Sequence, residues 1–327
     1  MMVRTPRDFS LIATILTMVF VVSVRDLLSQ DAPATRGWTW QAQAEAVLLR
    51  PIVSDNTAFT IRSSDGATFE RLETIEFDSD LKAGYRLSLG GTTEYGLGIR
   101  GGYFHWDGGT SQRSSRPPAN GFGAIEHPSF GDVDISSTIP QDAFAATRSL
   151  DASTAHGELT YQHGYELWDC GIGMGVESSS LEQHYQAQLT NDQVGLVGNL
   201  DSRRHFRGTG PTLVTEVRSS ILRRVDLFGS LRGSLLFGKN QWDFQGGEDL
   251  DLQPSLITTE HRSSASAITR LTGTVGTRLM LIQSSSFQCS SFVGLEGQTW
   301  LGSGTAQSAE GNLGLFGMTL GLEVVRR

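Results

Sequence analysis

Cysteine is scarce in this sequence, and its scarcity excludes several classes of protein. Among 327 residues only Cys170 and Cys289 are cysteines, and they form no CxxC pair, so neither a disulfide-dense scaffold nor a common zinc motif is indicated. The seven histidines include no i, i+4 pair and none is next to a cysteine. We therefore expect no cofactor and no metal.

Clusters of basic residues are also missing. The net charge is −9, lysines are few, and the arginines are dispersed along the chain. Because phosphate backbones are bound by clustered Lys and Arg, we expect no nucleic-acid partner.

Long apolar runs are confined to one N-terminal segment. Residues 10–24 are uncharged and follow Arg4 and Arg7, the basic-then-apolar order of a secretory signal. A small-residue cleavage site, Ala32-Pro33-Ala34, lies downstream. We expect a signal peptide over 1–34 and one β-barrel domain over 35–327. An uncleaved membrane anchor is the alternative.

Alternation of apolar and polar residues is the main feature of the remaining chain. In Trp38–Arg50, one face carries Trp38, Trp40 and Leu48, and the other carries Gln41 and Glu45. A period of two residues is typical of a β-strand, and about 9–11 residues suffice for a tilted strand to cross a bilayer. A mean hydropathy of −0.18 fits such strands, since only alternate residues would meet lipid.

Nine further segments show the same alternation. They cover residues 81–89, 97–103, 152–163, 168–180, 205–218, 225–238, 270–281, 293–298 and 316–324. Short connections at 90–94, 164–167, 219–224 and 283–286 alternate with long polar ones at 51–79, 107–150, 190–203, 242–263 and 302–311.

This alternation of connection lengths is typical of outer-membrane barrels, which have short periplasmic turns and long external loops. We predict an all-β, antiparallel, up-and-down transmembrane barrel of about ten strands (range about 8–12), located in the outer membrane. A soluble β-sandwich or barrel with its apolar face inward is the alternative, because alternation alone does not say which face is inside.

The polar face of these strands would line the lumen with charges of both signs. The predicted lumen-lining residues are Glu45, Lys82, Arg86, Arg100, Glu158, Glu177, Glu216, Arg218, Arg232, Arg270, Arg278, Glu296 and Glu323. In a narrow barrel such long side chains would meet, and burial favours Arg–Glu pairs between strands. They would form either a polar plug or a narrow channel. Gly171, Gly173 and Gly175 would open space on this face, or let a large neighbour such as Arg218 pack closely.

Enzymatic motifs are weak. Asp78 and Asp80 could aim two carboxylates in one direction, but no Asp-x-His pair is present to complete a protease site at the rim. Gly96–Gly101 fits GxGxxG formally, but it lies within a predicted strand and no helix follows. We expect no enzyme.

Several stretches resemble the Legionella-type major outer-membrane protein family of pore-forming barrels. They are Trp40 with Ala44-Glu45-Ala46-Val47-Leu48, Phe77-Asp78 leading to Gly84–Gly90, Phe206–Pro211, Gly233–Gly238, Gly294–Trp300 and the segment Gly317–Val324. The resemblance covers about residues 38–325 and implies an outer-membrane barrel and a pore. It supplies no catalytic residues.

Two kinds of function follow from these observations. The first is a narrow porin for small solutes or a structural envelope protein, whose partners are outer-membrane lipid and, for the porin, the solutes. The second is a surface-binding or adhesion protein in which segment 107–150 contacts a ligand above a plugged barrel.

Overall fold

The computed structural model describes residues 37–64, 70–117, 123–127, 135–166, 168–248, 256–308 and 310–326. The expected signal segment over 1–34 lies outside these residues. Within the described ranges, no helix has the length and apolarity needed to cross a bilayer.

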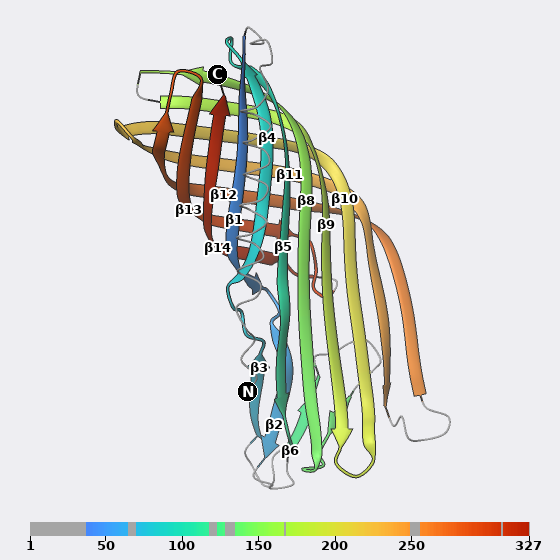
Figure 1. The fold of residues 1–327 in the computed structure, drawn as a ribbon. Helices are drawn as coiled ribbons and strands as arrows, with labels where there is room; N and C mark the ends of the chain where they lie inside the picture. Colours follow the sequence, from blue (N-terminus) through green and yellow to red (C-terminus); the bar gives the residue numbers. More distant parts are fainter. Residues whose placement is uncertain are drawn as a thin grey trace.

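Ten antiparallel strands form a closed barrel (Figure 1). They are β1 (Trp38–Val53), β4 (Lys82–Thr93), β5 (Leu97–Ser115), β8 (Asp142–Gly164), β9 (Trp168–Asn191), β10 (Gly195–Leu222), β11 (Val225–Glu248), β12 (Leu256–Gln283), β13 (Phe287–Leu301) and β14 (Leu313–Arg326). Each strand pairs with the next barrel strand in the chain, and β14 pairs with β1 to close the ring. The predicted ten-strand, up-and-down barrel is confirmed.

A second, smaller sheet comes from the two longest connections. It contains β2 (Thr57–Ser64), β3 (Glu70–Glu76), β6 (Gly123–Glu126) and β7 (Ser136–Ser137), in the order β3-β2-β6-β7. Phe59 of β2 and Ile125 of β6 are buried in one core with Phe144 of β8 and Tyr185 of β9. This apolar contact holds the small sheet against the barrel wall.

Several expected external loops are strand instead, which corrects our prediction. Strands β8 to β12 contain 23, 24, 28, 24 and 28 residues, whereas β14 contains 14. The strands remain hydrogen-bonded beyond the length that a bilayer requires. These extensions cover residues 107–115, 142–150, 190–191, 195–203, 242–248 and 256–263. Their Gly, Ser and Asp content suggested loops, but neighbouring strands satisfy their backbone hydrogen bonds.

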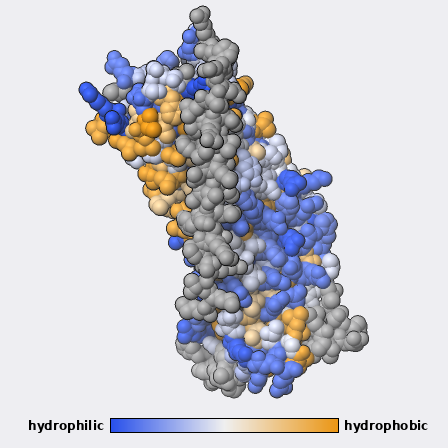
Figure 2. Space-filling model, in the orientation of Figure 1, coloured by the Kyte–Doolittle hydropathy of each residue, from blue (hydrophilic) through white to orange (hydrophobic). Residues whose placement is uncertain are grey.

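The outer face of the barrel is apolar over a limited band. On β11, the outward side chains of Leu227, Leu231, Leu235 and Phe237 are exposed, and the next outward residue is Lys239. In Figure 2 hydrophobic residues gather toward the barrel end that carries the C-terminus, and the surface over the extended strands is mostly hydrophilic. The apolar side chains therefore face outward, as expected for a barrel in lipid and opposite to the soluble alternative.

Candidate functional site

Inward-facing charges form a layer inside the barrel. Twelve of the thirteen predicted lumen residues take part in Arg–Glu pairs there. The exception is Lys82, which borders a separate cavity described below.

One cluster is centred on Arg86 of β4. Its guanidinium lies 2.8 Å from Glu45 of β1 and 2.6 Å from Glu296 of β13. Glu45 and Arg86 are direct partners in the β1–β4 register, whereas Glu296 is 210 residues away in the chain. Thr319 donates a further hydrogen bond of 2.8 Å to Glu45. The cluster thus joins β4 to three other strands.

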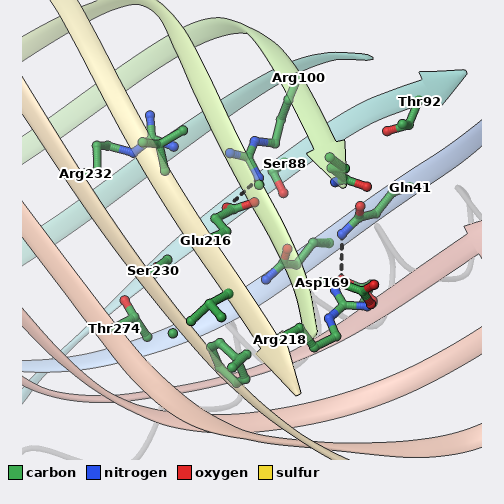
Figure 3. A pocket seen from close by; sticks show the side chains of 18 of the residues that line it. Gln41, Ser88, Thr92, Arg100, Asp169, Glu216, Arg218, Ser230, Arg232 and Thr274 are labelled. Carbon is green, nitrogen blue, oxygen red and sulfur yellow. Dashed lines mark hydrogen bonds and ion pairs between the residues drawn. The ribbon is translucent and has the colours of Figure 1, made fainter. Parts of the chain in front are cut away.

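A second cluster involves Arg100, Glu158, Glu216 and Arg232. Arg100 lies 2.9 Å from Glu158 and 2.7 Å from Glu216, and Arg232 also binds Glu158. The Glu158 side chain is completely buried, so its charge is compensated by two arginines in place of water. In Figure 3 Arg100 and Glu216 point toward one another inside the barrel.

Two further groups complete the layer. Arg270 lies 2.9 Å from the fully buried Glu177. Arg278 binds the fully buried Glu323, and Arg218 lies 4.0 Å from the same carboxylate. Six arginines therefore meet six glutamates, a neutral set that joins strands around the barrel.

A cavity of about 670 Å³ reaches into this layer, and nine of the twelve paired charged residues line it. Its lining includes Thr39, Glu94, Tyr95 and His163, at or near the short turns. It also includes Glu216 and Arg218, which are labelled in Figure 3. The cavity therefore lies at the short-turn end of the barrel, which is the periplasmic end by the connection lengths.

On the external side of the charged layer lies an apolar layer that we did not predict. This layer is one buried cluster of thirteen residues: Val47, Leu49, Phe104, Trp106, Leu150, Ala152, Leu181, Phe206, Leu236, Ile268, Trp300, Leu313 and Leu315. They come from nine of the ten barrel strands and share the inward parity of the lumen charges. Trp106 and Trp300 have no solvent exposure. A signal was present in the sequence, because the charged face of β5 changes to Phe104 and Trp106 after Arg100 and Gly102.

The inward glycines of β9 allow close approach between strands. A Cβ atom at Gly175 would lie 1.9 Å from the carbonyl oxygen of Gly157 on β8, and one at Gly173 would lie 2.8 Å from Val214 on β10. Arg218 is not among these nearest neighbours. Gly175 therefore makes room for the backbone of β8, and Gly173 makes room for the Val214 side chain.

Asp78 and Asp80 border a small cavity of about 150 Å³ with Lys82 and Arg148. Asp78 also lies 2.5 Å from Arg113 of β5. Burial lowers the pKa of Arg148 to about 10, and its guanidinium bonds Asn56. No histidine lines this cavity in the described part of the chain, so the two carboxylates have cations nearby and no imidazole as proton carrier.

Metal and thiol chemistry have little support in the described ranges. No group of three His, Cys, Asp or Glu side chains there is arranged to hold a metal ion. Cys170 on β9 and Cys289 on β13 are both free.

Comparisons with known proteins agree with this architecture. A family model described as Legionella pneumophila major outer membrane protein precursor matches residues 33–325. The search of curated protein sequences found no match.

Several solved structures are similar in fold. The outer-membrane protease OmpT of Escherichia coli has 7% identity and a TM-score of 0.42, with 88% of this chain and 96% of that chain covered. OprG of Pseudomonas aeruginosa has 8% identity and a TM-score of 0.31, with 87% and 95% covered. The P. putida toluene transporter TodX has 9% identity and a TM-score of 0.28, with 90% and 91% covered.

Proposed function

The chain belongs to the family of the Legionella pneumophila major outer membrane protein, and from this premise we propose that it is a structural outer-membrane barrel closed to solutes. In this proposal residues 1–34 direct export, and residues 35–327 form the barrel. The apolar layer closes the lumen, and the twelve paired charges on its periplasmic side join the strands. The long strands support an external platform.

The apolar layer is the observation that carries the proposal. Its thirteen residues are between 0 and 4% exposed, and they extend inward from nine of the ten barrel strands. A water-filled path would have to separate Trp106, Trp300 and their neighbours, which would expose their apolar surface at about 25 cal/mol per Å². Closure is therefore favoured.

The charged layer supports the same function. Glu158, Glu177, Glu296 and Glu323 have side chains with no solvent exposure, and each is bound by at least one arginine. An open porin would leave such groups hydrated, whereas here they bridge strands, which favours a rigid wall.

Conductance in planar bilayers tests the proposal. The refolded full chain should add no current steps to those of the bare bilayer. Replacing both Trp106→Ala and Trp300→Ala removes two large side chains from the apolar layer and should produce measurable conductance. Trp38→Ala with Trp40→Ala is the matched control, because these two tryptophans are exposed on the outer face and stack on each other.

Steady single-channel conductance by the unaltered protein would contradict closure and would favour the narrow porin. If none of the three proteins conducts, the proposal of a closed barrel stands, but the two tryptophans are not the barrier.

A further inference from the structure

Two cations lie opposite each other on the outer surface of the barrel, at the external edge of the apolar band. Arg207 on β10 and Lys239 on β11 are direct partners in the strand register, and both are exposed. Neither forms an ion pair with a described residue. Like charges directly opposite each other destabilise a sheet, so this pair is unfavourable in the absence of an anion.

Their height on the barrel indicates which anion they meet. Phe237, two residues before Lys239 on the same face, is 56% exposed and belongs to the apolar band. Two residues along a strand correspond to about 7 Å, so Lys239 lies just beyond the external edge of the apolar band. Short turns mark the opposite end as periplasmic, which places the pair at headgroup level in the external leaflet.

Small polar or apolar side chains flank the two cations. Ser180 on β9 is the register partner of Arg207, and Ala265 on β12 is the partner of Lys239. His205 is 3.1 Å from the hydroxyl of Ser180 and adds a third nitrogen-bearing group beside Arg207 and Lys239. The small side chains of Ser180 and Ala265 leave space for a ligand on the outer surface of the barrel.

The nearest carboxylate on this face already has a cation beside it. Glu182 is the register partner of His205 and lies diagonally from Arg207. Its carboxylate lies 4.0 Å from Arg203, higher on the extended wall. Glu182 therefore does not compensate the charges of Arg207 and Lys239.

We propose that Arg207 and Lys239 bind the phosphate groups of a phosphorylated lipid headgroup in the external leaflet. Arginine binds phosphate through two parallel N–H donors and lysine acts as a point charge, so together they fit one phosphorylated headgroup. The site depends on membrane location and wall geometry, and it holds whether or not the lumen conducts.

Lipid binding by the detergent-refolded full chain tests the site. The probe is diphosphoryl lipid A in mixed micelles, titrated against protein fluorescence, and the same lipid without its phosphates is the comparison. Arg207→Ala with Lys239→Ala should raise the Kd by about tenfold or more, because each removes a charge-assisted contact. Arg223→Ala with Arg224→Ala removes the same charge at the periplasmic turn and should leave the Kd unchanged.

Three results would overturn the assignment. They are an unchanged Kd in the Arg207/Lys239 variant, equal binding of the phosphate-free lipid, and complete displacement of lipid A by inorganic phosphate, which would indicate an ion site only. Heat-modifiable gel migration verifies folding of every variant. If the double variant fails to fold, Arg207→Gln and Lys239→Gln are measured singly, with the same expected direction.

Discussion

Arg86 shows how the buried charges are satisfied one residue at a time. Its side chain is 17% exposed, while those of Glu45 and Glu296 are 7% and 0% exposed. Removing water from three charges is costly, and the cost is offset only while every partner is present. The arginine therefore stabilises the barrel by compensating two carboxylates.

The substitution Arg86→Met should destabilise the protein by about 3–5 kcal/mol, because it leaves two buried carboxylates without their cation. Urea unfolding of the refolded barrel measures the change. Adding Glu45→Gln and Glu296→Gln to this variant should recover most of the loss. Arg62→Met is the control, since the exposed Arg62 lies 3.6 Å from Glu126 and such pairs contribute about 1 kcal/mol or less. A loss no larger than that of Arg62→Met would contradict the network.

At the level of strands, the close approach of β9 to β8 depends on glycine. Gly175 faces inward opposite Glu158, and the carbonyl oxygen of Gly157 occupies the position that a Cβ would take. A contact of 1.9 Å with backbone cannot be relieved by rotating a side chain, so the two strands would have to separate. The charged layer depends on this spacing, because Glu158 and Glu177 lie on these two strands.

We expect Gly175→Ala to reduce barrel assembly strongly, measured as loss of the heat-modifiable band after refolding. Gly157→Ala is the matched control. It makes the same chemical change one strand away, but a Cβ there has nothing within 4 Å. Equal assembly of the two variants would show that the β8–β9 spacing adjusts without cost.

For the whole molecule, the apolar band determines how the barrel lies in the membrane. Leu231 on β11 and Leu320 on β14 are 59% and 60% exposed on the outer face. Beyond the external edge of the band β11 continues with polar residues outside, so the apolar surface occupies only part of the barrel height. The extended wall then stands in the aqueous phase outside the membrane.

Leu231→Arg or Leu320→Arg should prevent membrane assembly, at a cost of about 2–4 kcal/mol if these positions lie near the midplane. Detergent-only extraction and heat-modifiable migration measure assembly. Gln241 lies on the same face of β11 as Leu231 but beyond the external edge of the band, so the Gln241→Arg variant should assemble normally. Normal assembly of both leucine variants would contradict the assignment of the lipid-facing side.

The number of barrel strands, and the division of each strand into an apolar and a charged face, were predictable from local alternation. Trp38–Arg50 already separates Leu48 from Glu45, and the period of two is a property of each strand alone. The ends of the long strands were not predictable, because Gly- and Ser-rich segments such as 195–203 become strand only when a neighbour supplies their hydrogen bonds.

Residue parity is enough to separate a charged face from an apolar face on each strand, but it leaves open which of the two faces is inward. Only the tertiary structure decides that the charged face is inward, which charges meet there, and that inward apolar side chains gather in one layer beside them. Glu296 reaches Arg86 across 210 residues, and Trp106 joins Trp300 in one layer only after the ring closes. Contacts of this kind depend on barrel closure and register, which no single strand contains.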